Sequence, residues 1–405
     1  MKSIFSPLPV ETRRRLDALP ELVDQVLPIP KRFRSGLPRD VAELSRLLTS
    51  GRGERNGSYL SEAPLLSAYL RYFLPWNVYR LIRLLPVLPL SLSAGVITDL
   101  GSGPLTLPIA LWISRPDLRS IPLEFRCMDR TAAVLDAGKK IFAALVSGDT
   151  KDDAAAAWIV KTVRASLGDP VRFPKANLVT AVNLFNELFW ELPRTGHPPQ
   201  GALSVFAEKQ ARLLSALSLE SGSILVLEPG VPRCGEFISL LRDALIAQGR
   251  LPLAPCTHAG PCPLPGTSAF RSGKGDSKWC HFAFTTADAP AALRRLSETA
   301  GLPKERAVLS FLLSGPVHTV PAPEPAPAGL LPVRVVSDAF PLTGKEKRPG
   351  HAALHGRYGC SARGLVLVSG KKDGIEALES GTQLKLTVKK PERRDGKSGA
   401  LELEL

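Results

Sequence analysis

The sequence predicts an α/β protein with a parallel sheet, a helical region before it and a small basic β-rich module after it. Between residues 95 and 284, apolar runs of strand length alternate with amphipathic segments, the pattern of βαβ units covered by helices on both faces. A proline-rich spacer then separates this part from short β-like runs. We therefore expect a helical region at 1–92, the α/β domain at 93–320, a linker at 321–330 and the basic module at 331–405.

The charge of the chain indicates the class of its partner. A formal net charge of +14 and a pI near 9.7 give the folded surface a positive field that attracts polyanions, of which nucleic acid is the commonest. A basic enzyme with solvated lysines and arginines fits the charge equally well, so charge alone leaves both readings open.

We expect neither a secretory signal nor a membrane span in this chain. The most apolar stretch, residues 74–97, contains Arg80, Arg83 and several prolines, which are costly in a bilayer. We expect a cytoplasmic monomer without a membrane partner. In a reducing compartment its six cysteines are expected to form a metal site or to remain buried thiols rather than to pair as disulfides.

The helical region ends in an aromatic segment at residues 69–85. Its large side chains recur at spacings of three and four, so they share one helical face. Packing of that face on the next domain is favoured over stacking on RNA bases. The residues are Tyr69, Tyr72, Phe73, Trp76, Tyr79 and Ile82.

The predicted strands and helices of the α/β domain follow the alternation directly. Helices are expected at 131–145 and 202–217. Strands are expected at 95–99, 123–129, 159–165, 178–184, 223–228 and 279–284.

A glycine turn follows the first predicted strand. The run VITDLGSGP at 96–104 places Gly101 and Gly103 where the backbone can approach a ligand, before a helix that opens at about Leu105 with free N–H groups. Asp129 ends the next strand, where a carboxylate can accept hydrogen bonds from ribose hydroxyls. Its spacing from the turn exceeds the usual figure of roughly 20 residues, and the loop at 113–122 accounts for the excess. The predicted cofactor-binding residues are Asp99, Gly101, Ser102, Gly103 and Asp129.

The spacing of this turn resembles that of class I S-adenosylmethionine-dependent methyltransferases, so S-adenosylmethionine is a candidate cofactor. Leu105 stands where a third glycine would be, and its side chain is a candidate to crowd the methionine part of that cofactor. After the fourth predicted strand, residues 181–188 read AVNLFNEL, with no Pro-Cys or Asn-Pro-Pro-Tyr-like motif. No catalytic residue is assigned: Asn183 and Glu187 could line a cleft, or Asn186 and Glu187 could begin a helix.

Three of the cysteines fall within one predicted loop at 250–282. Cys256 and Cys262 flank a Gly- and Pro-rich segment, and Cys280 lies in the run WCHF. Such loops build no core, so a metal that ties them together is expected. Cys360, in the basic module, is the best fourth ligand, and His258 and His281 are the alternatives.

The ligand set allows zinc or an iron-sulfur cluster. The absence of C-x-x-C pairs modestly favours iron-sulfur. The remaining two cysteines have other expected roles: Cys127 lies in an apolar strand and is expected to be a core thiol, and Cys234 is expected to be a spectator.

The basic module contains short β-like runs at 332–336, 364–368 and 384–388. Its loops are rich in positive charge. The residues concerned are Lys345, Lys347, Arg348, Lys371, Lys372, Lys389, Lys390, Arg393 and Arg394.

Several motifs, taken in order, resemble the methyltransferase-like family of mitochondrial small-subunit ribosome assembly proteins and their bacterial relatives. They are YLRYF at 69–73, DLGSGP at 99–104, NEL at 186–188, EPG at 228–230, C-x5-CP at 256–263 and WCHF at 279–282.

This resemblance, over roughly residues 60–365, implies a class I methyltransferase (Rossmann-like) fold and association with the small ribosomal subunit and its rRNA. It also implies a 4Fe-4S cluster, whose ligand positions match Cys256, Cys262, Cys280 and Cys360. Methylation activity is doubtful in that family, so an assembly or translation factor is expected, with an active rRNA methyltransferase as the alternative.

Overall fold

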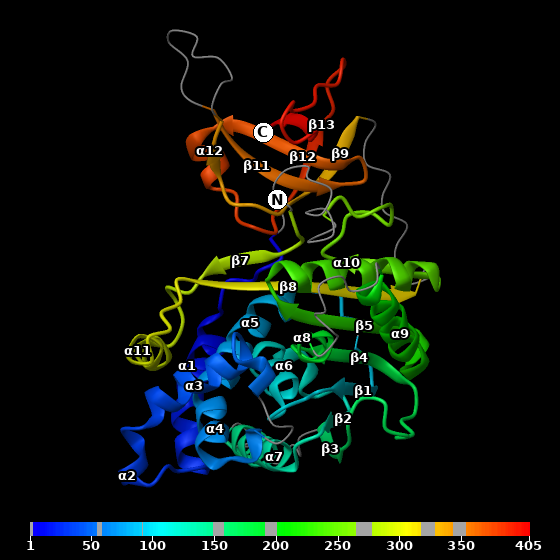
Figure 1. Ribbon diagram of the computed structural model, residues 1–405. Coiled ribbons are helices and arrows are strands. Elements are labelled where there is room, and N and C mark those ends of the chain that lie inside the picture. The colour runs from blue at the N-terminus through cyan, green and yellow to red at the C-terminus, as the bar shows by residue number, and fades with distance from the viewer. Residues whose placement is uncertain are drawn as a thin grey trace.

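The computed structural model describes residues 3–54, 59–90, 92–148, 158–190, 201–264, 278–316, 329–342 and 354–405. These residues form a helical region and two β-sheets (Figure 1). Within them, no helix combines the length and the apolar character that a bilayer crossing requires. The predicted linker at 321–330 and the loop residues Lys345, Lys347 and Arg348 fall largely or wholly outside the described residues.

The N-terminal region is helical, as predicted, and packs against the larger sheet's helices. Its last part carries the aromatic face: Tyr72, Trp76, Tyr79 and Ile82 are at most 2% exposed, which confirms core packing for these four. The elements are α1 (Val10–Val26), α2 (Lys31–Arg34), α3 (Leu37–Leu48), α4 (Ala63–Ala68), a π-helical segment η3 (Tyr69–Phe73) and α5 (Leu74–Leu84).

The larger sheet has the strand order β3-β2-β1-β4-β5-β8-β6, with β7 also pairing with β8. The first five strands in this order are parallel, whereas β8 runs antiparallel to β5, β6 and β7. The bounds are β1 (Gly95–Leu100), β2 (Leu123–Asp129), β3 (Trp158–Arg164), β4 (Ala176–Val182), β5 (Ser218–Pro229), β6 (Arg250–Ala254), β7 (Phe282–Thr285) and β8 (Arg306–Pro316).

Helices cover both faces of this sheet. One apolar cluster contains α1, α5, α6 and α7, and a second cluster on the other face contains α8, α9 and α10. Strand side chains divide between the two, because successive residues point to opposite faces: Leu225 and Leu227 join the first, and Ile224 and Val226 the second. The helices are α6 (Thr106–Ser114), α7 (Ala132–Ser147), α8 (Phe185–Phe189), α9 (Ala202–Leu217), α10 (Pro232–Ala247) and α11 (Ala291–Thr299).

The doubly wound sheet with one reversed strand near its edge confirms the predicted class I methyltransferase fold class. The predicted parallel arrangement holds for β1 to β5, whereas β8 runs antiparallel between β5 and β6. β6 and β8 were not predicted, and the strand predicted at 279–284 begins only at Phe282. The strand predicted at 178–184 ends at Val182.

The smaller sheet has the order β13-β9-β11-β12-β14, with β10 pairing with β11. Its own apolar cluster and its three predicted strands agree with a β-rich C-terminal module. Figure 1 shows it next to β7, β8 and the N-terminus. The bounds are β9 (Leu330–Val335), β10 (Phe340–Pro341), β11 (Leu354–Ser361), β12 (Gly364–Lys371), α12 (Lys372–Glu376), β13 (Gln383–Thr387) and β14 (Leu401–Glu404).

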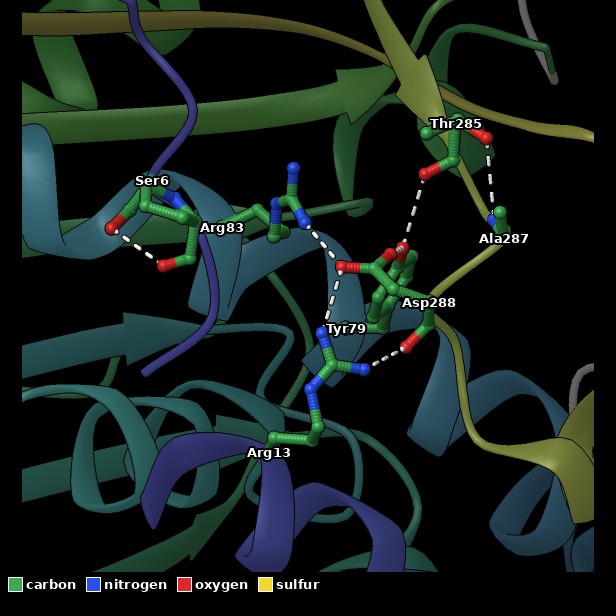
Figure 2. A network of polar contacts seen from close by, with 8 residues as sticks. Ser6, Arg13, Tyr79, Arg83, Thr285, Ala287 and Asp288 are labelled. Atoms are coloured by element: carbon green, nitrogen blue, oxygen red, sulfur yellow. Dashed lines mark hydrogen bonds and ion pairs between the residues drawn. The ribbon is translucent and has the colours of Figure 1, made fainter. Parts of the chain in front are cut away.

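A half-buried ion network ties the helical region to the larger sheet. Figure 2 shows Asp288, just after β7, accepting from Arg13 of α1 and from Tyr79 and Arg83 of α5. Arg83 Nη1 lies 2.7 Å from Asp288 Oδ2, and its guanidinium also covers the ring of Phe284. One carboxylate therefore joins three elements that are distant in the chain.

Candidate functional site

The glycine turn leaves β1 at the sheet edge where open α/β folds bind ligands. Gly101 and Gly103 adopt φ values of 65° and 54°, which favour glycine. At Gly101 a side chain would also collide with Leu184, because an added Cβ would lie 2.7 Å from its Cδ1. Ser102 closes the turn: its N–H donates to Met128 O and its hydroxyl to Asp99 O.

Leu105 departs from the expected glycine yet keeps a left-handed conformation, with φ 57° and ψ 43°. Its side chain is fully buried and packs towards Gly138 of α7, where an added Cβ would meet Leu105 Cγ at 2.8 Å. The leucine is thus accommodated by a glycine on the neighbouring helix.

Asp129 ends β2 beside this turn, as predicted. Its Oδ2 accepts from the Gly103 N–H at 3.0 Å and its Oδ1 from the Thr131 N–H at 2.9 Å. Burial raises the pKa of the carboxyl, and these two N–H donors oppose the rise. Each oxygen retains acceptor capacity, because a carboxylate oxygen has two lone pairs.

Asp99 lies beneath the turn and is 1% exposed. Its Oδ1 accepts from the Thr180 hydroxyl of β4 at 2.6 Å. Burial raises the pKa of Asp99 to about 6, and the hydrogen bond from Thr180 acts in the opposite direction. Asp99 therefore ties β1 to β4 under the glycine turn rather than facing a ligand directly.

Tyr69 joins this site from the helical region, which the sequence did not indicate. An added Cβ at Gly103 would lie 3.6 Å from the Tyr69 hydroxyl. Burial raises the pKa of that hydroxyl, and Glu187 and Asp129 are among the groups that raise it further. The residue lies in the π-helical segment η3, a geometry that often occurs at functional sites.

The end of β4 carries a backbone outlier. Asn183 has φ 56°, and its Oδ1 is buried with no hydrogen-bond partner among the described residues. The helix reading of the next residues is confirmed, because α8 spans Phe185–Phe189. The buried Glu228 of β5 accepts from the Asn186 side chain at 2.9 Å and from the Phe185 N–H at 2.8 Å, which fixes the start of this helix.

The four predicted ligand cysteines come from both sheets. Cys256 and Cys262 follow β6, Cys280 precedes β7, and Cys360 lies in β11 of the smaller sheet. Burial raises the pKa of Cys280, and the neighbouring thiols of Cys256, Cys262 and Cys360 raise it further. The four thiols are therefore within electrostatic reach of one another.

The arrangement of these thiols does not meet the geometry of a metal site. In the described ranges, no three or more His, Cys, Asp or Glu side chains form a group that could hold a metal ion.

The two alternative ligands and the two other cysteines lie in different surroundings. His258 Nε2 lies 3.4 Å from Cys360 Sγ, whereas His281 stacks on Trp279. Cys127 and Cys234 are both fully buried, in the two apolar clusters on opposite faces of the larger sheet. Both positions suit core thiols.

The comparison with known families matches one segment of the chain. Residues 202–344 match the family described as mitochondrial small ribosomal subunit Rsm22. No curated protein matches the chain in sequence.

Similar solved structures are methyltransferases of low identity. A class I S-adenosylmethionine-dependent methyltransferase from Listeria monocytogenes is 12% identical, with 78% of this chain and 90% of that chain covered and a TM-score of 0.34. One from Thiobacillus denitrificans, in complex with S-adenosyl-L-homocysteine, is 14% identical over 59% of this chain and 90% of that chain, with a TM-score of 0.30.

A 16S rRNA methyltransferase, KamB, is 14% identical, with 55% of this chain and 88% of that chain covered and a TM-score of 0.29. At these scores the assignment of the fold rests on the strand order itself. The segment that matches the family holds Glu228, Cys256, Cys262 and Cys280. The resemblance that the sequence motifs indicate, to a family of the mitochondrial small ribosomal subunit, is therefore confirmed over residues 202–344.

Proposed function

We propose that this chain is an assembly or translation factor that binds the rRNA of the small ribosomal subunit. The observation that carries the proposal is the match of residues 202–344 to a family whose description names the mitochondrial small ribosomal subunit. The methyltransferase fold then serves mainly as a binding scaffold.

Exposed lysines of the C-terminal sheet would supply part of the RNA contact. Lys371, Lys385, Lys390 and Lys397 are exposed and make no ion pair within the described ranges. Their charges are therefore available to phosphates, whose neutralisation releases counterions and makes binding weaken as salt rises. We propose residues 93–320 and 331–405 as the two units that contact RNA.

A 4Fe-4S cluster held by Cys256, Cys262, Cys280 and Cys360 would fasten these two units together, with zinc as the alternative. The support is the donor set: four thiols within electrostatic reach, contributed by both sheets. Such a centre would supply a covalent cross-link between loops that build no core of their own. Because burial raises the pKa of the thiols of Cys256, Cys280 and Cys360, loading of these three ligands must release protons.

Sedimentation of the tagged chain with ribosomal particles tests the proposal. The chain should co-sediment with small-subunit particles at low salt and dissociate as salt rises. Replacement of Lys385 and Lys390 by Gln should weaken binding, whereas Lys139→Gln on α7, whose lysine pairs with Asp136, should not. A wild-type chain that remains free of particles at every salt concentration would exclude this function.

The second candidate is an active S-adenosylmethionine-dependent rRNA methyltransferase. The observation that favours it is the intact turn, in which Asp129 fixes the Gly103 backbone and keeps acceptor capacity. Calorimetry with S-adenosylmethionine distinguishes the two candidates. A methyltransferase should show binding heat that Asp129→Ala abolishes and that Asp136→Ala, a change at an exposed acid of α7, leaves unchanged. A binding scaffold should show little heat in any variant.

A further inference from the structure

A cavity lies between α5, α11 and the loops after β7 and before β8. Its volume is about 410 Å³, which is within the range of small-ligand sites. It lies at the edge of the larger sheet where the parallel strands end, because Leu309, near the start of β8, pairs with Pro229 at the end of β5. The glycine turn leaves β1 at this same edge.

Hydrogen bonds between different elements hold the walls of this cavity. Trp76 Nε1 of α5 donates to the Ser297 hydroxyl of α11 at 3.2 Å. Figure 2 shows the Tyr79 hydroxyl donating to the carbonyl oxygen of Thr285, at 3.1 Å. Trp76, Thr285 and Ser297 all line the cavity, so its shape is set by the fold before any ligand enters.

Lys304 lines the cavity and lies over two aromatic rings. Its Nζ is 5.4 Å from the ring centroid of Tyr72 and 5.6 Å from that of Trp76, which are cation–π distances. Within the described residues, this Nζ has no hydrogen-bond acceptor and no ion-pair partner. The Thr286 hydroxyl donates to the Lys304 carbonyl oxygen and fixes the backbone. Since an ammonium group has three donors, its N–H groups are available to a ligand.

Arg80 of α5 places a second positive charge near Lys304. Arg80 Nη1 donates to Asn77 Oδ1 at 2.9 Å, whereas its buried Nε has no hydrogen-bond partner among the described residues. Burial, followed by the charge of Arg80, lowers the pKa of Lys304 to about 7. No carboxylate in the described part of the chain forms an ion pair with either cation. Two neighbouring cations without an anion are costly, so this part of the cavity favours an anionic ligand.

The acids of the cavity occupy exposed positions. Glu298 of α11 and Glu305, directly before β8, both line it, and both are exposed. Water and salt therefore screen their charges. Arg294, one turn before Glu298 on α11, also lines the cavity and offsets part of their charge. The half-buried charges beside the aromatic rings are thus both positive.

The π-helical segment η3 lies next to both this cavity and the glycine turn. The Tyr69 hydroxyl is close to Gly103, and Tyr72, three residues later, lies against Lys304. The Tyr72 hydroxyl donates to Leu302 O at 3.3 Å, which ties the segment to the loop before β8. A ligand in the cavity would therefore contact the same segment as a nucleoside in the turn.

We propose that this cavity binds a phosphate monoester, with Lys304 as its ion-pairing partner and the rings of Tyr72 and Trp76 beside it. A phosphate monoester carries roughly −1.5 to −2 charges near pH 7, so it balances Lys304 and Arg80 together, whereas a carboxylate or a backbone phosphodiester balances only one of them. The inference goes beyond the ribosomal role, because such a group occurs on free nucleotides and at the 5′ end of RNA.

Amine labelling of the full-length wild-type chain tests the proposal. Formaldehyde with a mild hydride donor methylates neutral amines, and mass spectrometry gives the rate at each lysine. With its pKa lowered to about 7, the Lys304 amine is partly neutral at that pH and therefore reactive. Inorganic phosphate and AMP at saturating concentrations should slow labelling of Lys304 by about tenfold, because a bound anion holds the amine protonated. The exposed Lys140 of α7 should be labelled at an unchanged rate.

Calorimetry identifies the source of the phosphate. AMP should bind more tightly than adenosine, or a 5′-phosphorylated RNA oligonucleotide more tightly than the same oligonucleotide with a free 5′ hydroxyl. Lys304→Met, which keeps the length of the side chain, should weaken phosphate-dependent binding by about tenfold. Arg295→Gln is the matched control, because this exposed residue of α11 does not line the cavity, and it should bind as the wild type does.

Three results would overturn the proposal. They are a Lys304 that stays unlabelled without any ligand, which would mean that the cavity is closed, labelling that phosphate and AMP leave unchanged, and a Lys304→Met chain that binds the phosphorylated probes as tightly as the wild type. All of these measurements use the purified chain without ribosomal particles. Their outcome is therefore separate from the sedimentation test of the ribosomal function.

Discussion

Leu105 and Gly138 pack against each other where the glycine turn meets α7. The side chain of Leu105 occupies the space above Gly138, and the backbone of Pro104 lies so close that a Cβ on Gly138 would meet its carbonyl carbon at 2.4 Å. Leucine stands at 105 where a glycine was expected, and Gly138 on the facing helix leaves the space that its side chain needs. The nucleoside turn keeps its shape because α7 approaches it closely.

Gly138→Ala should destabilise the chain. The added methyl group would overlap backbone rather than a flexible side chain, so overpacking of about 1–3 kcal/mol should outweigh the better helix propensity of alanine. Urea unfolding measures the difference. Gly148→Ala is the control, because its Cβ would meet nothing closer than 3.5 Å, and it should be nearly neutral.

Leu105→Gly tests whether the leucine obstructs a cofactor. The change removes a fully buried side chain and should cost about 2–4 kcal/mol, partly offset by about 1 kcal/mol from relief of the left-handed backbone. Because the side chain faces Gly138, calorimetry should show no gain in S-adenosylmethionine affinity. A variant that binds the cofactor more tightly than the wild type would mean that Leu105 blocks the site.

Asp99 should give the chain a pH-dependent stability. Its pKa is raised to about 6, so the folded chain holds the proton more tightly than the unfolded chain, whose carboxyl titrates near 4. The free energy of unfolding of the wild type, relative to that of Asp99→Asn, should therefore fall by up to about 3 kcal/mol as pH rises from about 4 to 6. Above that range the difference should stay constant. Unfolding free energies measured across this range check the slope. An Asn variant with an unchanged profile would contradict the raised pKa.

Asp288→Ala should loosen the helical region from the sheet. The change leaves Arg13 and Arg83 without their shared carboxylate (Figure 2), and the half-buried site should lose about 2 kcal/mol. Thermal unfolding is the measurement. Asp338→Ala, which breaks an exposed pair with Arg306, should cost less than about 1 kcal/mol. Equal losses of stability in the two variants would mean that the Asp288 network contributes no more to stability than an exposed ion pair.

The sequence predicted correctly those helices and strands whose pattern of apolar residues runs uninterrupted from end to end. The strand at 123–129 and the helix at 202–217 have the predicted bounds, because each shows its apolar pattern without interruption. β6 was missed because it contains Pro252 and begins with Arg250, whose buried guanidinium donates to Gly222 O and Leu219 O of β5, two strands away in the sheet. The reversed β8 was missed because strand direction depends on contacts far apart in the chain.

The sequence predicted the site residues that belong to a recognisable strand-turn-helix motif. It did not predict the residue that only tertiary packing brings to the site. The glycines of the turn and Asp129 follow from strand-turn-helix spacing. Tyr69 could not be assigned to that site, because its helical spacing indicated only a core face.

The metal content of the anaerobically purified chain tests the central claim most directly, namely that thiols from both sheets share one inorganic centre. We predict about four iron and four sulfide per chain, with broad visible absorbance, lost in Cys360→Ser and retained in Cys234→Ala, whose thiol is buried elsewhere. Stoichiometric zinc in place of iron would reject the cluster but keep the shared site. A wild-type chain without bound metal, or a Cys360→Ser chain that keeps it in full, would contradict the account.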